Sequence, residues 1–253
     1  MTNWFALISG GLFSGILAGF LGIGGGTVLV PLQIALGYPP LQSVATSSLA
    51  IIITAISGTV QNWRMGYINL QKVLFLGLPA IITSQIGVYL ANHISNRISL
   101  IAFGCLLLLN IYLVEIRKKL SKNHPTPQPF LNPILARILT GGAAGLLAGL
   151  FGVGGGVIMV PLQILLLAET IKVAIQTSLG VIIITAISAT LGHYLSGNIL
   201  FLEGIVLGIG GLIGAQISTR FLPKLPDSVV SFAFKTFLAM MSIYMFWQGF
   251  RKI

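Results

Sequence analysis

The sequence predicts an all-α polytopic membrane protein made of two homologous repeats, each with four hydrophobic segments and a first helix broken by glycines. Three observations lead to this fold class: the composition, a glycine motif that occurs twice, and an internal repeat. Hydrophobic residues make up 55% of the chain and charged residues only 7%, with a mean hydropathy of +0.98. A soluble domain carries about 25% charged residues. The composition therefore places the chain in a membrane.

The glycine motif is Gly22-Ile23-Gly24-Gly25-Gly26, followed by Pro31-Leu32-Gln33. The second copy is Gly152-Val153-Gly154-Gly155-Gly156, followed at the same spacing by Pro161-Leu162-Gln163. Both copies lie within apolar sequence, and glycine is the ordinary residue that destabilises a helix most. The motif therefore indicates a break in a membrane helix. Such a break leaves backbone N–H groups that must be buried in protein or must line a polar cavity.

The internal repeat has a register of about 130 residues. The heptapeptide IIITAIS occurs at Ile51–Ser57 and again, unchanged, at Ile182–Ser188. Further matches pair Thr46-Ser47 with Thr177-Ser178, Gly66 with Gly197, and Gln85 with Gln216. Matches of this extent indicate duplication. The predicted domains are a first membrane repeat over residues 1–122, a proline-rich basic linker over 123–134, and a second membrane repeat over 135–253.

The first hydrophobic segment of each repeat contains the glycine motif and is too long for one crossing. A continuous helix over Trp4–Leu36 would be about 50 Å long. The segment is therefore either one span interrupted near the middle of the membrane, or a span followed by a short re-entrant piece over Thr27–Leu36. We interpret its start as a retained span and not as a cleaved signal peptide, because Met1-Thr2-Asn3 contains no basic residue.

The other segments are shorter and continuous. In the first repeat they are Val44–Trp63, Val73–Leu90 and Ile98–Ile116; the second repeat has Leu135–Leu167 with its glycines, Ile175–Tyr194, Ile205–Leu222 and Val229–Trp247. The basic residues of the linker and the pair Arg251-Lys252 predict that both the linker and the C-terminus are cytoplasmic. Both placements agree with four crossings per repeat. If the broken segments re-enter without crossing, the parity is odd and the repeats are inverted.

Charge and cysteine content exclude several classes of function. The formal charge of +10 is concentrated in loops, where it favours contact with anionic lipid headgroups over binding of nucleic acid. Cys105 is the only cysteine, so an intramolecular disulfide and a thiolate cluster are excluded. The histidines have no metal-ligand spacing, and no nucleophile and base are paired. We therefore expect neither metal nor cofactor, and no enzymatic activity.

The glycine runs are the leading candidates for a substrate site. The residues after them do not supply the lysine and hydroxyl residue of a nucleotide-binding loop. Close helix packing is one interpretation, because small residues let membrane helices approach. The other is that Thr27 and Val157 begin half-helices whose free N–H groups face an anion. This second interpretation predicts convergence of the two half-helix starts on one site, formed by Gly24, Gly25, Gly26, Thr27, Gly154, Gly155 and Gly156.

Polar side chains near these runs could complete the site. Gln33 and Gln163 are amides at membrane depth and need partners inside the protein, either a substrate or a neighbouring helix. The hydroxyl residues Thr46, Ser47, Thr177 and Ser178 open the following spans, where they could bind a substrate or cap a helix. Changing Gly25 or Gly155 to leucine should abolish transport while leaving the protein inserted.

Three charged or titratable residues are candidate gates or sites of anion attraction. Lys235 is the only charge well inside a predicted span, although its stem is long enough to reach toward an interface. Arg64 and His193 lie near the ends of corresponding spans, where a gate or a proton site could be placed. Acidic residues fall at segment ends, which disfavours a cation transporter.

At these motifs the chain resembles the sulfite exporter TauE/SafE family of membrane permeases. The resemblance rests on the twice-occurring GxGGG with its downstream Pro-Leu, on the Thr-Ser pairs, and on Asn62-Trp63-Arg64-Met65-Gly66 with its counterparts His193 and Gly197. Asn62 differs from the family's usual histidine, and Leu195 from its usual basic residue. The resemblance implies about eight membrane segments in two related halves, and a substrate such as sulfite, thiosulfate or sulfoacetate, usually moved outward.

Together these observations predict a multi-pass protein of the cell membrane, most simply a bacterial inner membrane, that exports a small organosulfur or other oxyanion as a secondary transporter. Its expected partners are the anionic substrate and the lipid bilayer. The alternative is a passive anion channel or a carrier of another small anion. A channel would have the same lining, but its flux would not saturate at modest concentration. A membrane-embedded enzyme is disfavoured because a catalytic cluster is missing from the sequence.

Overall fold

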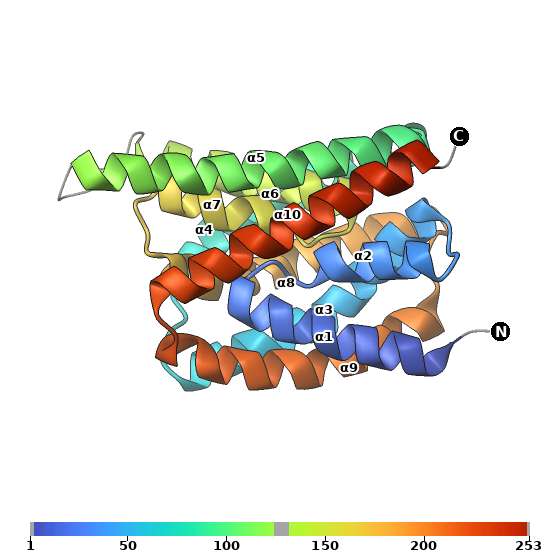
Figure 1. Ribbon diagram of the computed structural model, residues 1–253, viewed down its shortest axis with the longest axis horizontal. Helices are drawn as coiled ribbons and strands as arrows, with labels where there is room; N and C mark the ends of the chain where they lie inside the picture. Colours follow the sequence, from blue (N-terminus) through green and yellow to red (C-terminus); the bar gives the residue numbers. More distant parts are fainter. Residues whose placement is uncertain (1–2, 124–131, 252–253) are drawn as a thin grey trace.

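The computed structural model describes residues 3–123 and 132–251, and for residues 113–123 it describes the backbone only. The first half of the chain forms α1 (Trp4–Leu21), α2 (Gly26–Ala35), α3 (Pro40–Arg64), α4 (Leu70–His93) and α5 (Asn96–Asn123). The second half forms α6 (Pro133–Phe151), α7 (Gly156–Leu166), α8 (Ile171–Leu195), α9 (Phe201–Phe221), the 3-10 turn η1 (Leu222–Lys224) and α10 (Asp227–Arg251), as Figure 1 shows. Seven helices of the described ranges are long and apolar enough to span a membrane. The predicted all-α multi-pass architecture is confirmed.

Both predicted helix breaks are present, and glycine makes them. Gly22 closes α1 with a φ of 67° and donates its N–H to Ala18 O at 2.8 Å. Gly25, with a φ of 85°, precedes the first residue of α2. Left-handed backbone of this kind costs an L-residue about 1–2 kcal/mol, whereas glycine adopts it freely. The short helices begin at Gly26 and Gly156, one residue before the predicted starts Thr27 and Val157.

After the first break the chain turns back along α1. Ser14 Oγ on α1 donates to Gly25 O at 2.8 Å, and a Cβ on Gly10 would overlap the side chain of Leu32 near the end of α2. The second break turns in the same way, since a Cβ on Gly155 would overlap Ala144 O on α6. Each broken segment therefore returns to the end from which it started. Of the two alternatives for the broken segments, the re-entrant one describes the fold, and an interrupted single crossing does not.

Because each broken segment returns, the two ends of the chain lie at the opposite end of the molecule from the linker. α5 and α10 run antiparallel, because Ser242 Oγ donates to Gly104 O at 3.0 Å while Gly249 packs on Ile101. Figure 1 shows both termini at one end of the molecule, which we call the terminal end, and the end of α5 with the start of α6 at the opposite, linker end. The prediction that the linker and the C-terminus share the cytoplasmic side is therefore wrong.

The linker itself is shorter than predicted. α5 continues past Ile116 to Asn123, so the basic run at 117–122 belongs to a helix. α6 begins at Pro133. The proline-rich part of the predicted linker, at 124–131, lies outside the described residues.

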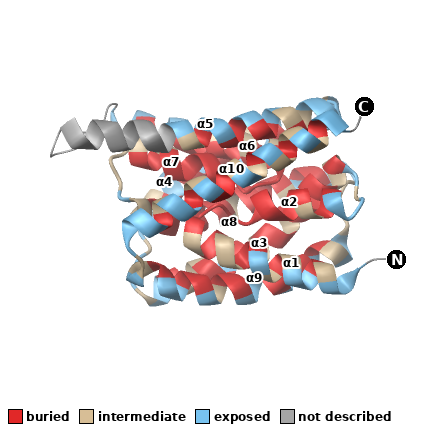
Figure 2. Cartoon of the chain, viewed as in Figure 1, coloured by how far each residue is buried: buried red, intermediate tan, exposed pale blue. Residues whose placement is uncertain are grey.

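The centre of the molecule is formed by α3 and α8. In their apolar windows 67% and 72% of the residues are buried, against 33–44% in the other candidate spans, and Figure 2 shows buried residues concentrated on the inner helices. Around this centre α1 packs parallel to α9, and α6 packs parallel to α4. Glycines make both contacts close: Cβ atoms on Gly15 and Gly149 would overlap the carbonyl oxygens of Gly211 and Ser84.

Candidate substrate site

The structure brings the two glycine runs together in the buried centre. A Cβ on Gly26 would overlap Gly152 O, and a Cβ on Gly156 would overlap Gly22 O. The two runs therefore pack backbone against backbone, each at the start of a short helix. All residues from 21 to 31 are buried, as are 151 to 161. Close packing, one of the two interpretations of the glycines, is confirmed by these contacts. The same close approach places both helix starts side by side, and the anion-site interpretation stays a prediction.

The start of a helix offers N–H groups that have no partner within the helix. In α2 the first such bonds are made by Val28 N and Leu29 N, which donate to Gly25 O at 2.9 and 3.1 Å. In α7 the corresponding bond joins Met159 N to Gly155 O at 3.1 Å. The N–H groups before these positions, and the positive ends of the two helix dipoles, belong to the region where the two runs are in contact. Such a region favours a small anion.

Thr27 adds a hydroxyl to this region. Its side chain is fully buried in the first turn of α2, and within the described part of the chain its Oγ1 has no hydrogen-bond partner. A buried hydroxyl without a partner costs free energy. The hydroxyl is therefore available to a bound anion. The second run has Val157 at this position, so the two helix starts are not equivalent.

The predicted amides clamp the short helices to the central ones. Gln33 Nε2 donates to Ser47 Oγ at 2.8 Å and to Ser43 O at 3.3 Å, which joins α2 to α3. Gln163 Nε2 donates to Ser178 Oγ at 3.0 Å and to Ala174 O at 3.3 Å, which joins α7 to α8. The N–H donors of both amides are thus used between helices in this conformation, and a substrate would have to displace them.

The Thr-Ser pairs lie inside helices and do not cap them. α3 begins at Pro40 and α8 at Ile171, more than one turn before Thr46 and Thr177, so the capping interpretation is wrong. Thr46 Oγ1 instead accepts the N–H of Leu200 at 3.1 Å and joins α3 to the start of α9. Thr177 is buried in α8 beside Ser178.

The three candidate gate residues lie in different parts of the molecule. Arg64 is exposed at the linker end of α3, where it lines a surface cavity of about 310 Å³ with Ser57 and Gln216. His193 is buried toward the terminal end of α8, with Nε2 3.0 Å from Gly149 O. Lys235 is half-buried on α10. The structure does not bring these residues together.

Sequence reasoning missed two hydroxyls that hold the breaks. Ser14 Oγ binds Gly25 O, and Thr185 Oγ1 on α8 binds Gly154 O, each at 2.8 Å. Thr185 stands within the repeated heptapeptide, so duplication was an available signal for it; Ser14 carries none. The matched glutamines, by contrast, do share a role. Gln216 and Gln85 bond to Ser57 and Ser188, the last residues of the two heptapeptides.

Acidic and metal-binding side chains are scarce around this centre. Within the described ranges, no three His, Cys, Asp or Glu residues come close enough together to hold a metal ion. The candidate donors are backbone N–H groups, a hydroxyl and amides. Neutral donors can hold an anion without trapping it, which is what passage across a membrane needs.

A polytopic helical protein whose broken helices start face to face in its centre has the architecture of a membrane transporter. The family model described as sulfite exporter TauE/SafE matches residues 7–245. The chain is 24% identical to the probable membrane transporter protein YunE of Bacillus subtilis, over 94% of this chain and 96% of the relative. It is 32% identical to the probable membrane transporter protein MJ0441 of Methanocaldococcus jannaschii, over 81% and 76%. The chain belongs to the TauE/SafE family and is a transporter, not an enzyme.

Proposed function

We propose that this protein is a secondary transporter that carries sulfite or a related small organosulfur oxyanion outward across the cell membrane. The observation that carries the proposal is the buried meeting of two helix starts at Gly26 and Gly156. An anion bound there would accept N–H groups from both short helices and the Thr27 hydroxyl. The family supplies the substrate class, because sulfite has the size and charge that such a site accommodates.

We further propose that α1–α5 and α6–α10 are homologous repeats of inverted topology. The heptapeptides and glycine runs correspond in sequence, and the helix contacts correspond in space. α1 lies on α9 as α6 lies on α4, and Gln216 reaches Ser57 as Gln85 reaches Ser188. Movement of one repeat relative to the other would expose a central site to each side in turn. The duplication then explains how one site comes to have two similar access routes.

The distribution of basic residues supports a cytoplasmic linker end. Helix ends and loops of the linker end contain most of the cations, namely Arg64, Lys72, Arg117, Lys118, Lys119, Lys122, Arg137, Lys172, Arg220 and Lys224. Among the described residues, the terminal end has Arg97 and Arg251. By the positive-inside rule both termini then face the outside. Arg220 and Lys224, at the end of α9 and in η1, agree with this placement.

Burial of the site favours a carrier over a passive channel. The glycine runs and the residues around them are closed to solvent on both sides, as in an occluded conformation. A carrier passes through such a conformation in every cycle, whereas an open pore does not. A channel remains the alternative function to be tested.

Counterflow in proteoliposomes tests the proposal. Vesicles preloaded with sulfite are given radiolabelled sulfite outside, with sulfate, thiosulfate, taurine or sulfoacetate as competitors. Saturable uptake that a subset of these anions inhibits would support a carrier and rank its substrates. Uptake that rises linearly with concentration would indicate a channel. Absence of uptake by folded, inserted protein would contradict sulfite as substrate, and chloride and small carboxylates would be the next anions to assay.

A further inference from the structure

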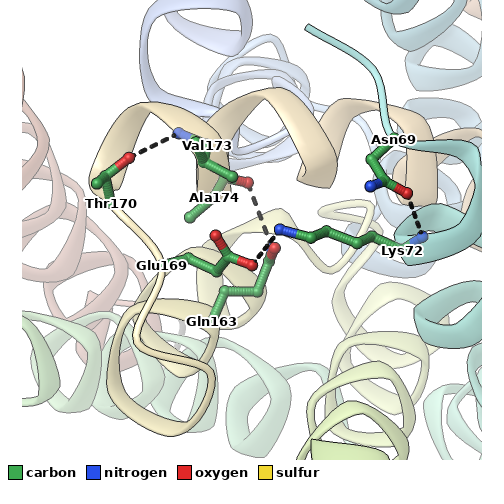
Figure 3. Close-up of polar contacts among 7 residues, drawn as sticks. All are labelled: Asn69, Lys72, Gln163, Glu169, Thr170, Val173 and Ala174. Carbon is green, nitrogen blue, oxygen red and sulfur yellow. Dashed lines mark hydrogen bonds and ion pairs between the residues drawn. The ribbon is translucent and has the colours of Figure 1, made fainter. Parts of the chain in front are cut away.

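An ion pair at the linker end joins the two halves of the chain. Lys72 Nζ, on α4, contacts Glu169 Oε1 in the loop between α7 and α8, as Figure 3 shows. The two side chains are 31% and 20% exposed, so the pair lies at the surface of the linker end and remains reachable from water. An anion in solution at the linker end can therefore reach it.

Lys72 occupies an unusual position for a cation. It lies in the first turn of α4, where its own N–H is capped by Asn69 Oδ1 at 3.0 Å. The start of a helix already carries positive partial charge, so a lysine there is unfavourable unless an anion compensates it. Glu169 is that anion in this conformation. The helix start and the lysine together form a positive site that a carboxylate of the protein now fills.

Glu169 is in turn fastened to the candidate substrate site. Its N–H donates to Gln163 O at 3.3 Å, and the Gln163 side chain joins α7 to Ser178 and Ala174 of α8. Gln163 lies seven residues beyond the start of α7 at Gly156, about 10 Å along the helix. Displacement of Glu169 would therefore pull on the helix whose other end lies in the site.

At the terminal end, the residue that corresponds to Lys72 in the internal repeat is acidic. Gly66 and Gln85 correspond to Gly197 and Gln216, and the same register pairs Lys72 with Glu203. Glu203 lies in the first turn of α9, where its charge suits the helix start. At this repeat position the side chain is therefore positive at the linker end and negative at the terminal end. This asymmetry agrees with loading from the linker side.

We propose that Lys72 and Glu169 form an anion-displaceable latch: Glu169 occupies Lys72 while the linker-end entrance is closed, and the substrate anion takes its place when the entrance opens. The inference rests on the proposed anion transport. It adds an entry site for the anion ahead of the glycine runs. It also gives the Lys72–Glu169 ion pair, which joins the two halves of the chain, a role in the opening of the linker end.

Opening is measured with a cysteine introduced at the buried Ala174, in a Cys105→Ser background reconstituted in nanodiscs, where both ends can be reached. Glu169→Gln and Lys72→Gln should each raise the rate of modification by a polar thiol reagent severalfold. The exchanged pair Lys72→Glu/Glu169→Lys should restore the slow rate. Asp227→Asn is the matched control, because it breaks the Lys172–Asp227 pair (3.3 Å) at the same end without touching Gln163. Unchanged rates in both single variants, or no restoration by the exchange, would overturn the latch.

Anion displacement is measured by counterflow of sulfite. Glu169→Gln removes the competing carboxylate and should lower the half-saturating concentration, whereas Lys72→Gln should raise it. Each change should be at most about fivefold, since exposed ion pairs are weak. Shifts in the same direction, or none, would overturn the entry site. If the parent protein does not transport sulfite, the proposed function fails while the thiol assay still decides whether the latch exists.

Discussion

The two glycine breaks share a sequence and a backbone but are held by different parts of the molecule. Gly24 and Gly25 have φ values of 72° and 85°, and Gly154 and Gly155 have 73° and 79°. In the first break the Gly25 carbonyl accepts a hydrogen bond from Ser14 on α1, the helix that the break ends. In the second break the Gly154 carbonyl accepts one from Thr185 on α8. The first break is thus fastened locally, and the second is fastened to the centre.

Identical sequence does not give identical contacts. Thr54 stands in the first copy of the heptapeptide where Thr185 stands in the second, yet Thr54 Oγ1 donates to Ala50 O of its own helix at 3.1 Å. Ser14 corresponds to Ala144, which has no hydroxyl to offer. The repeats therefore keep their backbone paths while their polar contacts differ. A movement of α8 would be transmitted to the second break more directly than a movement of α3 to the first.

The largest loss of stability is expected at the contact between the two breaks, where the two positions are equivalent. Gly26→Ala and Gly156→Ala each place a Cβ on a backbone carbonyl of the opposite break, which cannot move aside. Because backbone rather than a movable side chain is overlapped, the cost should lie at the upper end of overpacking, about 3 kcal/mol or more, and should be similar in both variants. Thermal unfolding in detergent measures this. Gly142→Ala is the control, because its Cβ would meet only Thr83 Cγ2, at 3.7 Å. Unequal losses would mean that the contact is not reciprocal.

The second prediction separates the two breaks. At Gly155 a Cβ overlaps the backbone oxygen of Ala144, whereas at Gly25 it overlaps the Ser14 hydroxyl, which can rotate. Both positions carry the strain of positive φ, about 1–2 kcal/mol. Gly155→Ala should therefore be the more destabilising change, and Ser14→Ala should partly rescue Gly25→Ala. Melting temperatures of the two single variants and the double variant decide this; additive losses at 14 and 25 would contradict it.

The smallest effect is expected from the heptapeptide threonines. Thr185→Val leaves the buried Gly154 carbonyl without its donor, a loss of about 1–3 kcal/mol. Thr54→Val removes a bond to a carbonyl within its own helix and should cost less than about 1 kcal/mol. Denaturant unfolding of both variants provides the comparison. Equal losses would show that the two threonines have the same structural role after all.

The sequence predicted the helices and the breaks, because composition and glycine spacing act locally. It did not predict whether a broken segment crosses or returns. Length allows both for Trp4–Leu36, and the contact of Gly10 with Leu32 decides it. The prediction that the C-terminus lies on the same side as the linker then failed, because the number of crossings decides where the C-terminus lies. Lys72 and Glu169 stand far apart in the sequence, each near the end of a segment, so their pairing depends on the fold alone.

The packing of α1 on α9 also affects the order in which the helices can assemble during biosynthesis. α1 is synthesised well before α9, yet the groove that receives Gly11 and Gly15 belongs to that later helix. α6 by contrast finds α4 already in place. Until α9 is inserted, α1 must therefore remain in lipid, or beside the insertion machinery, with its glycine face uncovered. Fragments divided between α5 and α6 would be expected to mature only when both are produced in the same cell.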